Sequence, residues 1–396
     1  MSYFETTNIK MADSPAVDAF ARMRVSQPTT LFDGKQVTDS GSLVWSTKTV
    51  GNATSSFQQV SASSLFTLSG SGTVLRQTKR RFGYQSGKSQ LIVCTGNFIN
   101  INEPVDKRIG YFDNNNGIFF HSSASAFNVG LRKNGVDTII SQSNWNLDIF
   151  NGSGSSGKMT DPDCSQIYFF DIEWLGVGRV RYGIYQAGMP YYVHQITHVN
   201  VLEDVYMSNP NLPVRYELSS SNANSTGSMR QICSTVISEG GADNVGSIRS
   251  VDTGTVVNIA ATTVTPTSIL AIRLDSTKLS NVVFPTSFST INLSGNSSYL
   301  AYLAMNPTTS SNFSWQSIPD SAVQFSTGSV VMTNIGTKIA STIVSSVADQ
   351  ITIPLDPSIA LGSTADGVSD IIVIGVTNFG GTSQNFAASL NYKESQ

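Results

Sequence analysis

The stretch that most constrains the fold runs from residue 167 to residue 200, and its pattern predicts three consecutive antiparallel strands. Large apolar residues alternate there with polar ones, as in strands with one buried and one exposed face. The apolar positions are Tyr168, Phe170, Ile172, Trp174, Val180, Tyr182 and Ile184. A loop at 176–178 would set Trp174 opposite Val180 and Glu173 opposite Arg181, which gathers the apolar side chains on one face. The sequence therefore predicts a β-meander.

The two-residue periodicity extends from Ser42 to about residue 240. Turn signals at 69–72, 85–87, 113–117 and 134–135 separate the expected strands. These strands are at 43–50, 73–80, 89–98, 108–112, 118–121, 127–132, 136–140, 214–218 and 229–239. Many short antiparallel strands around one long meander predict an all-β fold, with a jelly-roll-like sandwich over residues 36–245.

The composition shifts after the glycine-rich segment 239–246. From Val251 to the end, four basic residues stand against eight acidic ones, so this part carries a charge of −4 and residues 1–250 carry +1. Strand patterns continue, and the apolar run at 371–374 predicts a central strand. We expect a second, smaller β-sandwich over residues 246–396.

We expect residues 1–35 to form an N-terminal arm that precedes the first sandwich. Ser14 followed by Pro15 predicts the start of a short helix that ends before Pro28. Such a helix is too short to be stable alone, so Phe20 and Val25 should dock on this subunit or on a neighbour, and both options stay open. The first fifteen residues lack an apolar segment, so we expect no signal peptide. No apolar run of about 18 residues predicts a membrane-spanning helix.

Charge and cysteine content exclude several classes of function. The chain has 13% charged residues and a net charge of −3, with a pI near 5.6. A nucleic-acid binder would need a basic footprint. The three widely spaced cysteines fit neither a disulfide framework nor a zinc site, and predict free thiols in a protein made in a reducing cytoplasm.

Two groups of residues could carry chemistry in the meander. Asp171 and Glu173 share one strand face, which invites a glycosidase interpretation. Arginines on the next strand favour cross-strand ion pairs instead. His194 and His198 also share a face, but a metal site needs further ligands, so we expect structural histidines.

Two loops outside the meander have alternative interpretations. The segment Asp113–Gly117 faintly resembles a calcium loop but lacks the downstream glutamate, which favours a plain turn. The basic cluster 79–81 beside two aromatic residues could bind single strands of nucleic acid, yet the overall charge favours an intersubunit contact or a solvated strand end. Because no catalytic motif is present, we predict no catalytic residue, cofactor or metal.

Several segments together resemble a family of virion proteins from tailed double-stranded DNA phages, many of them marine. They are DAFARMRVSQPTTLFD (18–33), VLRQTKRRFGYQSGKSQL (74–91), KRIGYFDNNNGIFF (107–120), SQSNWNLDIFNGSGSSG (141–157), FDIEWLGVGRVRYG (170–183), HQITHVN (194–200), VYMSNPNLPVRYEL (205–218) and ICSTVISEGG (232–241). The resemblance covers residues 18–241, with Ala21 where the family pattern has Gly.

The resemblance implies a structural role in the virion, as a capsid decoration, head-fibre or tail-fibre component, and no catalytic residues. Implied partners are other capsid or tail proteins and further copies of the chain, with a trimer expected by analogy. The candidate assembly contacts are Phe20, Arg22, Arg24, Val25 and Phe32. An alternative is a fibre module that binds a host receptor or glycan through surface aromatics. A polysaccharide hydrolase acting through Asp171 and Glu173 is the least favoured hypothesis.

Overall fold

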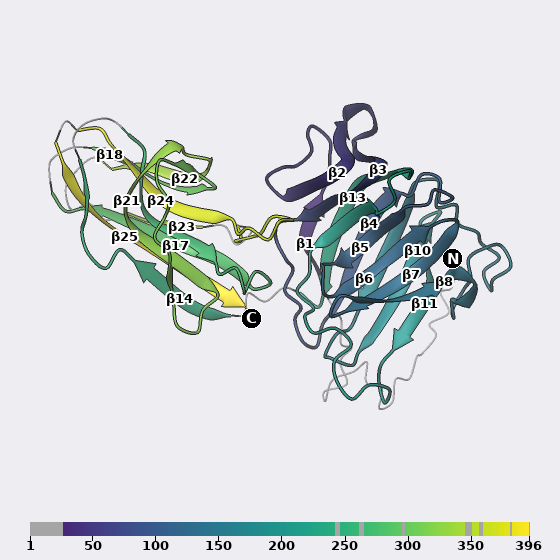
Figure 1. Cartoon of the computed structure of the whole chain (residues 1–396). Coiled ribbons are helices and arrows are strands. Elements are labelled where there is room, and N and C mark those ends of the chain that lie inside the picture. Colours follow the sequence, from purple (N-terminus) through teal and green to yellow (C-terminus); the bar gives the residue numbers. More distant parts are fainter. Residues whose placement is uncertain are drawn as a thin grey trace, which may run out of the picture.

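The computed structural model describes residues 27–241, 246–260, 265–294, 298–344, 351–355, 359–380 and 382–395. It is built from antiparallel strands, with two short 3₁₀ turns at Gln59–Ser61 and Gln142–Asn144. The all-β prediction is therefore confirmed. Two groups of strands that lie side by side in Figure 1 form two β domains.

The first domain is one curled sheet of 13 strands, in the order β11-β10-β9-β4-β13-β3-β12-β5-β6-β7-β8, with β1 beside β13 and β2 beside β3. Its strands are β1 (Pro28–Gly34), β2 (Trp45–Gln58), β3 (Ser63–Thr78), β4 (Ser89–Asn97), β5 (Asp106–Phe112), β6 (Gly117–Ser123), β7 (Ala126–Lys133), β8 (Val136–Ser141), β9 (Gln166–Ile172), β10 (Arg179–Gln186), β11 (Met189–Thr197), β12 (Val214–Ser220) and β13 (Thr226–Glu239). The chain passes between the two halves of the sheet at β4–β5, β8–β9 and β11–β12, and these crossings are its jelly-roll-like feature.

The two halves of this sheet face each other across an aromatic core. Phe120 on β6 lies 5.5 Å from Phe170 on β9 and 6.1 Å from Tyr182 on β10, measured between ring centroids. The Tyr182 hydroxyl donates a hydrogen bond to the Gly130 carbonyl on β7. The apolar face predicted for the meander thus forms one wall of the core.

The register predicted within the meander is wrong by two residues. Arg181 pairs with Asp171, and Val180 pairs with Ile172. The loop is longer than expected: the Glu173 N–H donates to the Arg179 carbonyl, the Gly178 N–H donates to the Trp174 carbonyl, and the Trp174 indole N–H donates to the Met207 carbonyl, 3.0 Å away. A shift of two residues keeps every side chain on its predicted side of the sheet. The side predicted to be exposed is nevertheless partly covered, because Phe169, Asp171 and Gly183 are buried.

The β2–β3 hairpin differs from the predicted strands at 43–50 and 73–80. Both strands are longer, and the glycine-rich segment 69–72 lies inside β3, where the chain bends instead of turning. Gly70 adopts φ +118 at this bend, a conformation that glycine tolerates. Beyond the bend β3 leaves β13 and pairs with β12.

The second domain is a sandwich of two antiparallel sheets. One contains β14 (Ser247–Asp252), β15 (Val257–Ile259), β17 (Val282–Asn292), β23 (Ile351–Pro354) and β25 (Gln384–Ser395); the other contains β16 (Thr267–Leu274), β18 (Tyr299–Met305), β19 (Thr308–Thr309), β20 (Gln316–Ser317), β21 (Val323–Asn334), β22 (Thr337–Val344) and β24 (Ile371–Asn378). Phe386 and Leu390 from the first sheet share a core with Leu303 and Ile374 from the second. The strand predicted at 371–374 is central, because β24 lies between β16 and β18.

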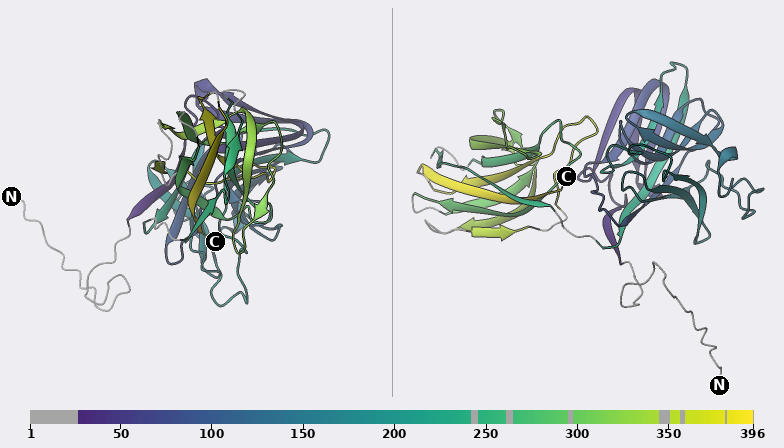
Figure 2. Two further views of the ribbon diagram at one scale, coloured as in Figure 1. Left: turned by 90° about the vertical axis from the view of Figure 1, so that its left-hand side faces the viewer. Right: turned by 90° about the horizontal axis from the view of Figure 1, so that it is seen from below.

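The basic cluster 79–81 lies at the contact between the two domains. The Arg80 guanidinium lies 5.6 Å from the Phe82 ring centroid and 5.0 Å from the Phe284 ring centroid of the second domain. The Ser363 N–H donates to the Lys79 carbonyl at 2.9 Å. Arg80 therefore forms a contact between two domains of one chain, which none of the three predicted uses of the cluster included. The right-hand view of Figure 2 shows the two domains side by side.

The predicted helical arm lies outside the described residues, up to residue 26. The last part of the proposed arm is a strand, since β1 (Pro28–Gly34) pairs with β13 of the main sheet. An arm that is separate from the first domain therefore ends before Pro28.

Candidate functional site

The carboxylate pair predicted on the meander lies in a cleft of about 230 Å³ on the outer face of β9 and β10. The cleft is lined by Tyr84, Gly87, Lys88, Ser89, Asp171, Glu173, Leu175, Arg179 and Arg181. Asp171 is buried, whereas Glu173 and Arg179 are exposed. The cleft therefore offers groups of both charges to a polar ligand.

Asp171 is held by its neighbours on β10 and β11. Arg181 forms an ion pair with it, and the Tyr192 hydroxyl donates a hydrogen bond to Oδ2 at 3.1 Å. The Arg181 guanidinium also lies 4.1 Å from the Tyr192 ring centroid. Burial and the adjacent carboxylate raise the pKa of Tyr192 to about 12. Cross-strand ion pairing is confirmed in part: Arg181 pairs with the buried Asp171, not with Glu173 as predicted. A carboxylate held in this way is poorly suited to act as a general acid.

An aromatic group extends this outer face beyond the ion pair. Phe169 lies against Gly183 on β10, where an added Cβ would come within 2.1 Å of the ring. Its ring centroid is 4.7 Å from that of Tyr185 and 5.2 Å from that of Tyr192. Because Tyr185 and Tyr192 are half-buried, part of this aromatic surface faces solvent.

The histidines are structural, as expected. The buried His194 accepts a hydrogen bond at Nδ1 from the Asn146 N–H. The buried His198 pairs with the Gly178 carbonyl at 2.6 Å and stacks on Tyr206 at 4.2 Å. Burial lowers the pKa of both imidazoles. Within the described ranges no three His, Cys, Asp or Glu side chains gather to hold a metal ion.

The segment Asp113–Gly117 is a turn, in agreement with the favoured interpretation. Asp113 Oδ1 accepts hydrogen bonds from the N–H groups of Asn115 and Asn116, and Oδ2 pairs with Arg81 at 2.7 Å. Burial alone would raise the pKa of Asp113, but the Arg81 charge and these N–H groups outweigh it and hold the pKa below 3.8. With an arginine already on the carboxylate, the loop does not present it to a cation.

Replacing Asp113 with Asn should lower the free energy of unfolding by about 1–3 kcal/mol at pH 7, because charge-assisted hydrogen bonds are lost. A depressed pKa in the folded state means that this stabilisation is full above the ordinary pKa of 3.8 and disappears as the pH falls through the folded value. In urea unfolding, the difference in free energy of unfolding between variant and wild type should be smaller at pH 3 than at pH 7. Asp204→Asn, at an exposed pair with Lys133, should change little at either pH.

A layer of arginines over buried rings covers the other outer face of the first domain. Arg132 lies 5.5 Å from both Phe112 and Phe119, and Arg108 lies 5.6 Å from Phe119. Asp137 binds Arg132 through two hydrogen bonds of 2.6 and 2.9 Å. Sequence analysis missed this layer, although Gly130, opposite Phe119, was a signal for it. An added Cβ on Gly130 would lie 2.2 Å from the Phe119 ring.

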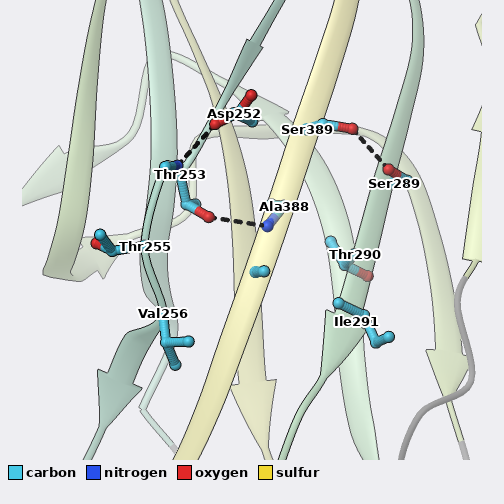
Figure 3. Close-up of a pocket in the computed structure, with 11 residues that line it drawn as sticks. Asp252, Thr253, Thr255, Val256, Ser289, Thr290, Ile291, Ala388 and Ser389 are labelled. Carbon is cyan, nitrogen blue, oxygen red and sulfur yellow. Dashed lines mark hydrogen bonds between the residues drawn. The ribbon is translucent and has the colours of Figure 1, made fainter.

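A second hollow lies on the second domain, where β14 and β15 leave a gap along β25 (Figure 3). The Thr253 N–H and hydroxyl there bond the Ala388 backbone, and the Ser289 and Ser389 hydroxyls lie 2.7 Å apart. Asp252 is the one ionisable residue in its lining. A groove of hydroxyl groups without an aromatic platform or a nucleophile–base pair carries no evident chemistry.

Of the candidate assembly contacts, the structure describes Phe32, and Phe20, Arg22, Arg24 and Val25 lie outside the described residues. Phe32 is half-buried within its own domain, 5.7 Å from the Trp45 ring centroid and 5.4 Å from that of Phe82. This side chain therefore anchors β1 to the core.

No family model and no curated protein matches this chain. Solved structures that resemble it include a protein of unknown function from Shewanella oneidensis MR-1, with 11% identity and a TM-score of 0.36, over 61% of this chain and all of that one. A β-glucanase of Bacillus licheniformis has 11% identity and a TM-score of 0.33, over 56% of this chain and all of that one. Peanut lectin has 8% identity and a TM-score of 0.32, over 54% and 97% of the two chains. Likenesses this distant carry no conclusion about function.

No helix among the described residues has the length and apolarity needed to cross a membrane.

Proposed function

We propose that this chain is a structural component of a tailed-phage virion that acts through protein–protein contacts. The observation that carries the proposal is the use of the charged residues in the segments that resemble the phage family. Arg81, Arg108, Arg181 and Arg215 each form ion pairs within the domain. Arginines that form ion pairs between strands stabilise a rigid domain, as a structural protein requires. A catalytic site would need some of these charged side chains to be unpaired.

The roles proposed for the parts of the protein follow from their order along the chain. Residues 1–26 precede the first strand, so they and the first domain form the attachment module, and the second domain projects from it. In this account the chain is made in the host cytoplasm and is incorporated with other capsid or tail proteins. Phe20, Arg22, Arg24 and Val25 are the contacts proposed for the arm.

Removing residues 1–26 tests this division without touching any described strand, because β1 begins at Pro28. The shortened chain should fold with an unchanged thermal midpoint and should be absent from purified particles. A full-length variant with Phe20→Ala and Val25→Ala serves as a second probe and should be incorporated less. If both proteins are incorporated into particles normally, the proposed role of the arm in attachment is wrong.

The cleft on β9 and β10 favours receptor or glycan binding as a second candidate. Exposed Glu173 and Arg179 flank it, and Tyr185 and Tyr192 lie on the same face of the sheet. Wild-type protein on an array of bacterial surface glycans should then give signals that Arg179→Ala and Tyr192→Ala abolish. An array without signal removes this candidate. The hydrolase hypothesis fails if Asp171→Asn and Glu173→Gln leave polysaccharide cleavage unchanged, or if the wild type shows none.

A further inference from the structure

The strand β2 has the longest open edge in the described part of the first domain. It has 14 residues and pairs with β3 alone. The edge of β11 is covered, since the N–H groups of Leu147 and Asp148 donate to the Val193 carbonyl at 3.2 and 3.1 Å. The other outer strands of the described sheet are shorter: β8 has 6 residues and includes Asp137, and β1 has 7 residues and pairs with β13 alone. In Figure 1, β2 and β3 form the projecting upper corner of the domain.

The second domain covers the beginning of β2. The Ala365 N–H donates to the Ser46 hydroxyl at 2.9 Å, and Lys48 pairs with Asp366 at 2.9 Å. A bulge follows between Gly51 and Ala53. The regular, uncovered part of the edge is therefore the segment 53–58.

This uncovered part lacks the usual protection against strand pairing. Protein edges are normally guarded by lysines, prolines or inward charges. Residues 49–62 contain none of these. Exposed apolar side chains flank the segment instead, with Val50 at 51% and Val60 at 105% of full exposure. An edge of this kind favours addition of another strand.

We propose that β2 pairs with β2 of a second copy of this chain, antiparallel across a two-fold axis, so that the two sheets become continuous. A strand meets itself in an antiparallel pair when the contact is isologous. Because 53–58 carries no charge, no register of this pair places like charges opposite each other. The pair would also cover Val50 and Val60. This inference is independent of the virion role and replaces the trimer expected by analogy with a two-fold assembly.

The test is the mass of the full chain in solution, measured by light scattering after size exclusion. Wild type should have the mass of a dimer or of an even multiple. The variant Thr54→Lys with Ser56→Lys should be a monomer with an unchanged circular dichroism spectrum, because four lysines would oppose one another in the pair. The neutral control Thr54→Gln with Ser56→Gln should remain associated.

A charge-exchange experiment separates pairing from unfolding. Mixing the lysine variant with Thr54→Glu, Ser56→Glu protein should restore the dimer mass, although each variant alone is a monomer. A monomeric or trimeric wild type, or a lysine variant that stays dimeric, would overturn the proposal.

Discussion

Replacing Lys107 with Met should lower the free energy of unfolding of the first domain by about 3–5 kcal/mol, the cost of breaking a buried, charged network. The Lys107 side chain is 0% exposed, and its ammonium pairs with Glu103 at 2.6 Å. It also donates to three successive carbonyls, those of Phe98, Ile99 and Asn100, at 2.6, 2.7 and 3.0 Å. Met fills the volume but takes the ammonium donor away from the Phe98 and Ile99 carbonyls, while the Asn100 carbonyl keeps the Glu103 N–H at 3.3 Å.

The loop around Lys107 adds to the expected loss. Ile99 and Asn100 adopt φ +43 and +51, a region that a β-branched residue such as Ile rarely occupies. The converging carbonyls that bind the ammonium depend on this conformation. Chemical denaturation followed by tryptophan fluorescence measures the effect. Lys133→Met is the matched control, since its exposed pair with Asp204 should contribute about 0–1 kcal/mol; equal losses in both variants would contradict the account.

Gly130→Ala should destabilise the first domain by about 3 kcal/mol, the upper part of the range for overpacking a core. The new Cβ would lie 2.2 Å from Cε2 of Phe119, so the ring has to move. Phe119 is fully buried, and Arg108 and Arg132 lie over its ring. Moving the ring therefore disturbs the arginine layer as well.

Thermal unfolding measures this effect, and a double variant identifies its cause. Phe119→Leu alone should cost stability, but combined with Gly130→Ala it should cost less than the sum of both changes, because the clash is gone. Gly83→Ala is the control, since its nearest neighbour atom would be 3.7 Å from the new Cβ. If the losses in stability of the two single variants are strictly additive in the double variant, the contact with the Phe119 ring does not explain why position 130 requires glycine.

The meander shows which structural features sequence periodicity can predict and which it cannot. Side-chain alternation assigned each residue of β9 and β10 to the correct face, because that assignment depends on neighbouring residues alone. The register depended on the loop, which includes Trp174, and the Trp174 indole bonds the Met207 carbonyl, 33 positions along the chain. A contact of that kind leaves no local pattern.

Two other outcomes have similar physical causes. The β2–β3 hairpin was missed because its tip, Gln59–Ser61, has no glycine or proline, and the turn is completed by Ala62 at φ +44. The role of Arg80 could not be predicted, since its stacking partner Phe284 belongs to the other domain. In the candidate site, the pairing of a carboxylate with Arg181 was predictable from strand alternation, although the partner is Asp171 and not Glu173. The aromatic group around Phe169 required the geometry of three strands.

The central claim is that this chain is a building block of a virion. Absolute quantification by mass spectrometry of gradient-purified particles tests it most directly, in particles produced from the genome that encodes the chain. The account predicts a fixed copy number per particle that matches a multiple of the particle's symmetry. Infectious particles that lack the protein would contradict it.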